Sequence, residues 1–325
     1  MRKSGGVAET PLVLARRAAA YLEGKGIEGA RLDAELLLAH VLGVSRLELY
    51  LQHDRPLSPA EVEAYREVVR RRARREPLQY IVGSVRFREL ELKVDPRVLI
   101  PRPETEVLVE EVLKWARERE AQRADRGGED RGGGQAGAAQ GGELSAVDIG
   151  TGSGAIALSL AYEGPFTRVV ATDVSADAIA VAEENARRHG LLDRVEFRRG
   201  SLWKALAPGE RFDVVVSNPP YVSEAERPGL QPEVRDWEPA TALFAPEGGL
   251  GILMELVDGA PNHLRPGGLL ALEVGFGQAG AVVRRIEATG RYGAPRVVRD
   301  LAGRERVVLA TLAGLANGTE KNNHA

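Results

Sequence analysis

The residues Asn218-Pro219-Pro220-Tyr221 carry the clearest chemical signal in this chain. They follow the apolar run 212–217, so we expect them at the point where a strand ends. Neither proline has a backbone N–H, and the loop therefore presents mainly carbonyl oxygens, to which Asn218 adds a side-chain oxygen. Such a cluster of acceptors suits a planar NH2 group rather than a phosphate or a carboxylate. The alternative for an isolated motif is a plain turn, because proline also ends strand pairing.

A glycine-rich turn, Gly150-Thr151-Gly152-Ser153-Gly154, follows the apolar run 144–149. Glycine permits a tight turn and a close approach of backbone to a ligand, although the spacing differs from the usual dinucleotide fingerprint. Asp173 directly follows the next apolar run, 168–172, and lies about 20 residues beyond the glycines. An acid at this position can accept both hydroxyls of a ribose. The two features together indicate a nucleoside ligand, and the absence of a phosphate-binding loop favours one without phosphates.

Gly200-Ser201-Leu202-Trp203 marks the end of a third strand, where an adenine would lie between apolar groups. Plain packing is an equal alternative for Trp203. Four successive strand ends thus supply a glycine turn, an acid for a ribose, an apolar wall and an acceptor loop for an amine. The combination predicts a site that brings a nucleoside cofactor to an NH2 group.

The elements that must position these residues alternate between strands and helices from residue 144 onward, which predicts an α/β fold with a parallel sheet covered on both faces. Ligands of such sheets bind at the carboxyl ends of the strands, near the switch point of the strand order. The predicted strands are 144–149, 168–172, 212–217 and 268–274, the helices are 154–162, 175–189, 249–264 and 278–289, and two closing strands are 295–299 and 305–312.

The chain before residue 144 has a different organisation. Residues 10–75 read as a small helical bundle, in which Ser58 and Glu61 form a capping box. A period-two pattern at 80–94 predicts a hairpin between two domains, and Pro103 can open the following helix. The segment 121–142 has almost no apolar side chains and is expected to be a flexible insert.

Composition favours a cytosolic enzyme. The chain has 325 residues, no cysteine and five histidines without ligand-like spacing, so we expect neither disulfides nor a metal site. Its net charge is -3, which argues against a dedicated nucleic-acid binder, and the arginine-rich run 70–75 is expected to complement a helix dipole and stay solvated. We see no apolar run of membrane-spanning length and no signal peptide.

These motifs resemble the HemK/PrmC family of class I methyltransferases. The resemblance covers nearly the whole chain and rests on 75–80, 99–106, the turn 148–154 and the segment 216–221. Asn-Pro-Pro-Tyr alone is shared with several amino-group methyltransferases, whereas its combination with Leu-Ile-Pro-Arg-Pro-Glu-Thr-Glu at 99–106 is much more specific. The resemblance implies a Rossmann-like, seven-stranded sheet with an N-terminal helical bundle and a β-hairpin linker. The implied divisions are a helical recognition domain at 1–76, a linker at 77–100, a methyltransferase domain at 101–314 and a disordered tail at 315–325.

The resemblance also implies an activity, namely transfer of a methyl group from S-adenosyl-L-methionine to the side-chain amide nitrogen (N5) of the glutamine in the Gly-Gly-Gln motif of peptide chain release factors. It implies a cytoplasmic enzyme, expected to be a monomer, without membrane or direct nucleic-acid binding. The alternative that the residues leave open is an amino-group methyltransferase acting on a nucleic-acid base.

The family match further implies roles for individual residues. Asn218 and Pro219 would be catalytic, and both would bind the substrate glutamine together with Pro220 and Tyr221. The cofactor would be held by Gly150, Thr151, Gly152, Ser153, Gly154, Asp173, Leu202 and Asn218. Ser201 stands where the family often has an acid, a departure that concerns the adenine contacts.

Overall fold

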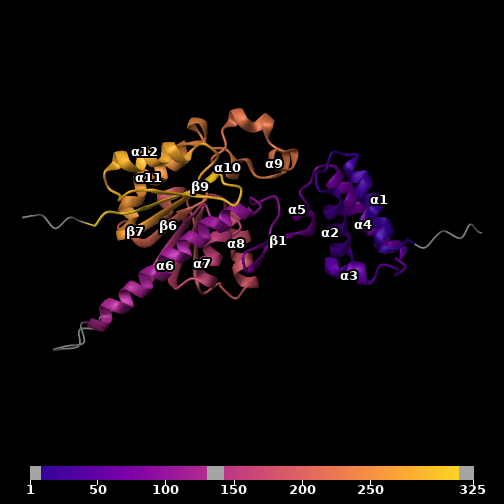
Figure 1. The fold of residues 1–325 in the computed structure, drawn as a ribbon, viewed down its shortest axis with the longest axis horizontal. Coiled ribbons are helices and arrows are strands. Elements are labelled where there is room, and N and C mark those ends of the chain that lie inside the picture. The colour runs from indigo at the N-terminus through magenta and orange to yellow at the C-terminus, as the bar shows by residue number, and fades with distance from the viewer. Residues whose placement is uncertain (1–8, 130–142, 315–325) are drawn as a thin grey trace, which may run out of the picture. The chain divides into compact units, whose positions relative to one another are not determined.

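The structure is a computed structural model, and it describes residues 9–129 and 143–314. They divide into two compact units, each of which is considered by itself. The first holds the chain up to Ser84 together with Leu230–Trp237, and the second holds Val85–Gly229 and the residues from Glu238 onward. Figure 1 labels many of the elements of both units.

The first unit is a helical bundle. Its helices are α1 (Pro11–Glu23), α2 (Ala30–Leu42), α3 (Arg46–Leu51), α4 (Pro59–Ala73), α5 (Leu78–Val82) and α9 (Pro232–Trp237). Leu22, Leu37 and Leu38 are fully buried in its core. The Tyr65 hydroxyl donates to the carbonyl oxygen of Ala34 at 2.8 Å, so this buried phenol leaves no unpaired polar group.

Helix caps in the first unit show how the sequence sets local structure. The capping box is confirmed, because Ser58 Oγ accepts from Glu61 N at 3.3 Å while the Glu61 carboxylate accepts from Ser58 N at 2.7 Å. At the start of α1, Thr10 is the N-cap residue but its side chain makes no capping hydrogen bond. Pro11 in the first turn therefore carries the start signal there.

The sequence predicts that the arginine-rich run 70–75 stays solvated, but part of it is buried. Arg72 is buried and donates to Asp33 at 2.7 Å and to Glu233 of α9 at 2.9 Å. Arg75 donates to the other carboxylate oxygen of Glu233 at 2.7 Å. The prediction was wrong because the partner Glu233 is distant in the sequence, and a buried guanidinium requires such a partner.

The second unit is built on a mixed sheet with the strand order β5-β4-β3-β6-β7-β9-β8, in which β9 runs antiparallel to both of its neighbours. Its strands are β3 (Leu144–Ile149), β4 (Phe166–Asp173), β5 (Val195–Arg199), β6 (Phe212–Ser217), β7 (Leu264–Glu273), β8 (Arg296–Arg299) and β9 (Glu305–Thr311). The seven strands confirm the α/β fold class expected from the resemblance. A separate two-stranded sheet is formed by β1 (Ser84–Phe87) and β2 (Leu90–Lys93).

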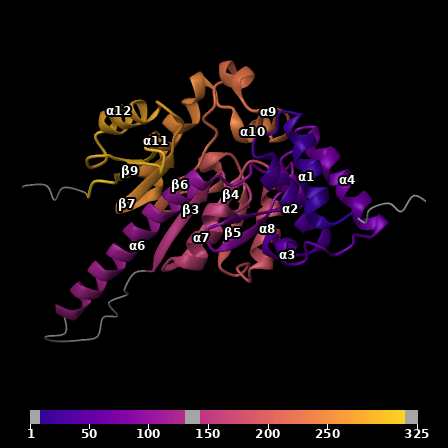
Figure 2. The same ribbon diagram turned by 45° about the vertical axis from the view of Figure 1, so that its right-hand side comes forward.

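Helices cover both faces of this sheet (Figures 1 and 2). One face packs against α6 (Pro103–Glu129), α7 (Ala155–Glu163) and α8 (Ala176–Arg188), and the other against α11 (Gly251–His263) and α12 (Ala279–Thr289). Each face of the sheet has its own hydrophobic core, and successive strand residues point to the two cores in alternation. Ala146, for example, lies in one core and Val147 in the other. The short elements are η1 (Leu202–Ala205), η2 (Glu224–Gly229), α10 (Ala240–Leu243) and η3 (Glu247–Gly249).

Two sequence expectations are corrected by the elements themselves. Part of the expected hairpin linker is helical, because α5 occupies Leu78–Val82 before β1 begins. The first residues of the expected flexible insert are also helical, since α6 continues to Glu129. Glutamate, alanine, glutamine and arginine favour helix even without an apolar stripe, and they continue α6 beyond residue 120. The rest of that insert, 130–142, and the tail 315–325 lie outside the described residues.

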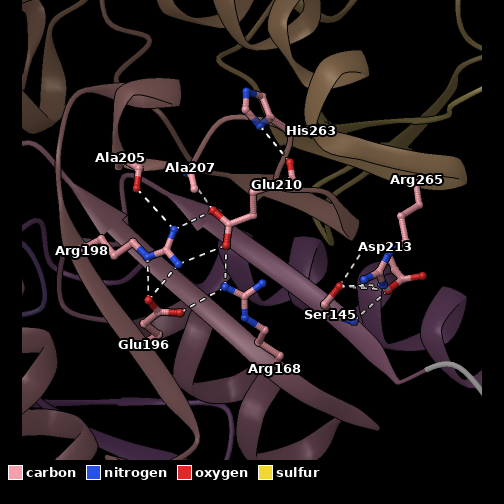
Figure 3. A network of polar contacts seen from close by, with 10 residues as sticks. All are labelled: Ser145, Arg168, Glu196, Arg198, Ala205, Ala207, Glu210, Asp213, His263 and Arg265. Carbon is pink, nitrogen blue, oxygen red and sulfur yellow. Dashed lines mark hydrogen bonds and ion pairs between the residues drawn. The ribbon is translucent and has the colours of Figure 1, made fainter.

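Ion pairs connect the region around the start of β6 to β4, β5 and β7 (Figure 3). Glu210 accepts from Arg168 at 2.5 Å and from Arg198 at 2.7 Å and 3.0 Å, and these bonds hold the pKa of Glu210 at about 2. Asp213, at the start of β6, pairs with Arg265 and accepts from Ser145 N of β3 at 3.0 Å. This network connects β6 to its neighbouring elements and includes none of the predicted site residues.

Candidate functional site

The carboxyl ends of β3 and β6 lie side by side at the centre of the sheet. The register pairs Asp148 with Val216, and Ser217 Oγ donates to the carbonyl oxygen of Ile149 at 2.6 Å. After β3 the chain builds outward through β4 and β5, whereas β6 and β7 lie on the other side of β3. The glycine turn and the Asn218 loop therefore leave the sheet at its switch point, where open α/β sheets bind ligands.

The glycine turn depends on backbone conformations that other residues rarely adopt. Gly150, Gly152 and Gly154 have φ values of 79°, 56° and 87°. A Cβ at Gly150 or Gly152 would meet nothing within 4 Å, whereas a Cβ at Gly154 would stand 3.0 Å from the side chain of Leu158. The first two glycines thus leave open space above the turn, and the third lets the turn pack onto α7.

Asp173 lies at the end of β4 and is joined to the glycine turn. Its Oδ2 accepts from Gly152 N at 2.9 Å, and its Oδ1 accepts from Ser175 N at 2.8 Å. Burial raises the pKa of this carboxyl. Each carboxylate oxygen can accept a second hydrogen bond, so Asp173 retains capacity for ligand hydroxyls.

Asp148, the acid just before the turn, is a site residue to which we assigned no role from the sequence. It is fully buried, and its Oδ2 accepts from the Thr151 hydroxyl at 2.7 Å and from Ala157 N at 3.2 Å. Within the described part of the chain, its Oδ1 has no hydrogen-bond partner. Burial raises the pKa of Asp148 to about 7. An acid immediately before a glycine turn is the signal that could have identified it.

Leu202 follows β5 and adopts a left-handed conformation, with φ at 47°. It is half-buried and packs against the core on the α11 face. The neighbouring Trp203 stacks on His263 with ring centroids 4.9 Å apart, and its Nε1 donates to the carbonyl oxygen of Glu255 at 3.2 Å. These contacts favour plain packing of Trp203 against α11 over a role as an adenine wall. Ser201 is exposed.

The Asn218 loop contains one buried residue and three half-buried residues. Pro219 is buried, while Asn218, Pro220 and Tyr221 are half-buried. Asn218 Nδ2 donates to Thr105 Oγ1 at 3.0 Å, and no donor among the described residues contacts Asn218 Oδ1 or the Pro219 carbonyl oxygen. Two acceptors at adjacent positions are thus available to a ligand.

Tyr221 is held at both ends by residues of the β7–α12 region. Its hydroxyl donates to Glu273 Oε1 at 3.2 Å, and its carbonyl oxygen accepts from Gln278 Nε2 at 2.8 Å. Burial is the main cause that raises the pKa of the Tyr221 hydroxyl, and the Glu273 carboxylate adds to it. Tyr221 is therefore a neutral hydrogen-bond donor to Glu273, not a base.

Three further residues support the site and were not identified from the sequence. Thr105 belongs to the stretch 99–106 and donates to Glu273 Oε2 at 2.7 Å. Glu273 is buried at the end of β7, and an acid that closes an apolar strand is the signal that could have found it. Asn185 of α8 donates to the carbonyl oxygen of Ser153 at 2.9 Å and accepts from Lys93 N at 2.7 Å.

The structure thus brings the predicted residues together in two groups. Gly152 and Asp173 are directly hydrogen bonded, and the rest of the turn 150–154 is continuous with them. Asn218 and Tyr221 are joined through Thr105 and Glu273. Among the described residues no hydrogen bond links Leu202 or the Asn218 loop directly to the turn, so only the order of the strands brings these groups to one edge.

Residues 9–129 and 143–314 contain no group of three or more histidine, aspartate or glutamate side chains that could hold a metal ion. No helix in the same ranges is long and apolar enough to cross a membrane.

The fold and a family model together define the class of the protein. The catalytic domain of human METTL16, solved with an RNA hairpin, has 16% identical residues and a TM-score of 0.51 over 78% of this chain and 84% of its own. This likeness concerns the fold. With a family model described as the methyltransferase small domain, which matches residues 139–231, it identifies the second unit as a class I methyltransferase.

Sequence comparison identifies the family. A model described as the PrmC N-terminal domain matches residues 14–83. The release factor glutamine methyltransferase of Geobacter sulfurreducens is 44% identical over 83% of this chain and 86% of its own. That of Moorella thermoacetica is 42% identical over 89% of this chain and 94% of its own. This chain belongs to the release factor glutamine methyltransferase family, which confirms the resemblance to HemK/PrmC and does not favour a nucleic-acid base as the substrate.

Proposed function

We propose that this enzyme transfers a methyl group from S-adenosyl-L-methionine to the side-chain amide nitrogen (N5) of the glutamine in the Gly-Gly-Gln motif of peptide chain release factors. The observation that carries the proposal is the pair of available acceptors, Asn218 Oδ1 and the Pro219 carbonyl oxygen, at the switch point beside the glycine turn. The relatives that span most of the chain bear the name of this activity.

Features of the carboxyl edge fit S-adenosyl-L-methionine. Open space stands above Gly150 and Gly152, Asp173 can accept ribose hydroxyls, and the unpaired buried Oδ1 of Asp148 suits a positively charged group. We assign binding to Gly150, Thr151, Gly152, Ser153, Gly154, Asp173, Leu202 and Asn218. When bound, the cofactor supplies a methyl group activated by a positively charged sulfur, and the protein supplies position and electrostatics.

We assign the substrate glutamine to Asn218, Pro219, Pro220 and Tyr221. An amide nitrogen is a weak nucleophile because its lone pair is delocalised into the carbonyl group. Asn218 Oδ1 and the Pro219 carbonyl oxygen can each accept one of its two N–H groups, which fixes the nitrogen and favours pyramidal geometry. Lone-pair density then returns to the nitrogen on the side that faces the methyl donor.

The reaction needs no strong base in this site. The nitrogen would gain a bond to the methyl carbon while the bond between that carbon and the sulfur of the donor breaks, and the resulting protonated amide is so acidic that its extra proton passes to water. Tyr221 remains neutral and packs beside the amide plane. The residues of the Asn218 loop therefore act by position, which agrees with their lack of a basic side chain.

The remaining roles concern the whole enzyme. We expect the helical unit to bind the release factor at a surface away from its Gly-Gly-Gln loop, and the enzyme to act as a monomer in the cytoplasm.

Mass spectrometry tests the proposal. A release factor is incubated with the enzyme and S-adenosyl-L-methionine, digested and mapped. We expect the mass of one CH2 group to be added to the Gly-Gly-Gln glutamine and not to a factor in which that glutamine is replaced by asparagine. An unmodified glutamine under conditions in which the enzyme binds cofactor would refute the proposal.

A further inference from the structure

Asn218 and Tyr221 are both connected to one buried carboxylate, Glu273. Tyr221 donates to Oε1 at 3.2 Å, and Thr105 donates to Oε2 at 2.7 Å. Asn218 Nδ2 in turn donates to Thr105 Oγ1 at 3.0 Å. Thr105 is 3% exposed and Glu273 is 1% exposed, so water does not readily replace these partners. The four side chains form one chain of hydrogen bonds that ends at the acceptor loop.

The number of protons in this chain of hydrogen bonds determines which way the Asn218 amide points. A threonine hydroxyl carries one hydrogen, and an ionised carboxylate can only accept. When Glu273 is ionised, the hydrogen of Thr105 goes to Glu273, and Thr105 Oγ1 can only accept from Asn218. The NH2 of Asn218 must then face Thr105, and its Oδ1 is left for a ligand.

Removal of the negative charge reverses this direction. A protonated Glu273 can donate to Thr105, whose hydroxyl is then free to donate to Asn218. The amide would turn so that its oxygen faces Thr105 and its NH2 faces the ligand. An NH2 cannot accept from the substrate amide, so the clamp would lose one of its two acceptors.

We propose that Glu273 is a positioning residue which, through Thr105, fixes the orientation of the Asn218 amide and so selects a substrate that presents N–H donors. Glu273 touches neither substrate nor reacting atoms in this role. The proposal rests on the function proposed above for Asn218. It also gives Thr105, in the stretch 99–106, a role: its hydroxyl couples the charge of the Glu273 carboxylate to the orientation of Asn218 in the loop after β6.

The surroundings of Glu273 give the orientation a pH dependence. Burial is the main cause that raises the pKa of Glu273 to about 7, Glu104 of α6 raises it further, and Arg306 of β9 lowers it together with the hydroxyls of Thr105 and Tyr221. Above this pKa Glu273 is ionised and Asn218 Oδ1 faces the ligand. As the pH falls below about 7, the fraction of correctly oriented amide declines and kcat should decline with it.

Steady-state kinetics with a release factor test the relay. Thr105→Val keeps the shape but removes the hydroxyl, so we expect kcat to fall by about 10- to 100-fold, with the KM for S-adenosyl-L-methionine unchanged. Thr105→Ser should restore kcat to within about threefold of the wild type, because it retains the hydroxyl. Thr289→Val is the matched control, since within the described part of the chain the Thr289 hydroxyl hydrogen bonds only with local backbone at the end of α12. A Thr105→Val enzyme with the kcat of the wild type would refute the relay.

Glu273→Gln provides the second variant, because its amide can donate to Thr105 at every pH. We expect a low kcat without the decline toward acid pH that the wild type shows. A Glu273→Gln enzyme that keeps the wild-type kcat and acid limb would also refute the proposal.

Side-chain NMR separates this inference from the proposed function, since it needs no turnover. The NH2 resonances of Asn218, assigned by their loss in Asn218→Ala, should titrate through neutral pH in the wild type and stay constant in Glu273→Gln. Resonances that do not titrate in the wild type would refute the relay. A wild-type enzyme that shows the titration but leaves the release factor unmodified would support the relay and refute the substrate.

Discussion

Replacement of Asn218 by alanine is the most direct test of the acceptor clamp. The substitution removes Oδ1, which faces the ligand, and Nδ2, which donates to Thr105 at 3.0 Å. Thr105 keeps Glu273 as the partner for its own hydrogen at 2.7 Å, so the truncation leaves no buried donor unpaired. Asn218 is also only half-buried. We therefore expect the free energy of unfolding to change by less than about 1 kcal/mol.

The effect on catalysis should be much larger. One of two acceptors that hold the amide nitrogen is lost, and removal of one such group from a preorganised site costs about 3 kcal/mol of transition-state stabilisation. This corresponds to a fall of about 100-fold in kcat. Asn218 is also one of the residues assigned to the cofactor, so the affinity for S-adenosyl-L-methionine should fall, but by less than about tenfold, because the glycine turn and Asp173 are unaltered.

Radiometric methyl transfer to a release factor gives kcat and KM, and calorimetry gives the cofactor affinity. Asn262→Ala is a suitable control, since Asn262 is exposed at the end of α11 and its side chain hydrogen bonds only with Arg291 among the described residues. Thermal unfolding of both variants checks that each is folded. An Asn218→Ala enzyme whose kcat equals that of the control would refute the clamp.

Three further changes probe the other parts of the second unit and the first unit. Asp173→Ala should weaken S-adenosyl-L-methionine binding by about 10- to 100-fold, because charged hydrogen bonds to a ligand are lost, and an unchanged calorimetric Kd would remove Asp173 from the ribose role. Glu210→Gln should lower the free energy of unfolding by about 2 kcal/mol at neutral pH after allowance for solvent screening. The folded-state pKa of Glu210 is depressed to about 2, so this contribution is present above the unfolded pKa and is lost as the pH falls through the folded pKa. The urea midpoints of mutant and wild type should therefore differ at neutral pH and converge at acid pH. Ser58→Ala should cost about 1 kcal/mol in the same urea assay through loss of the capping box, and an unchanged midpoint would contradict that role.

Much of the fold was readable from local pattern. Apolar runs bounded by glycine and polar turns predicted the central strands, and β3 and β6 have the predicted bounds. A strand buried on both faces is a short continuous apolar run, and such a run is a strong local signal. Where tertiary contacts decide, the prediction failed: Arg72 is buried because Glu233 lies far along the chain, and no sequence window contains both residues.

The candidate site divides in the same way. Residue type and spacing were sufficient to select the glycine turn, Asp173 and the loop of Asn218, because their chemistry resides in backbone conformation and in donors and acceptors at strand ends. The roles of Thr105 and Glu273 were not visible, since a threonine and a glutamate 168 positions apart have no shared pattern. The strand order places the end of β7 beside the end of β6, and this alone lets one carboxylate reach both Thr105 and Tyr221. The sequence therefore determines which groups can hold an amide. The direction in which the Asn218 amide points is a property of the folded sheet, because only there do Asn218, Thr105 and Glu273, which are far apart in the sequence, form one chain of hydrogen bonds.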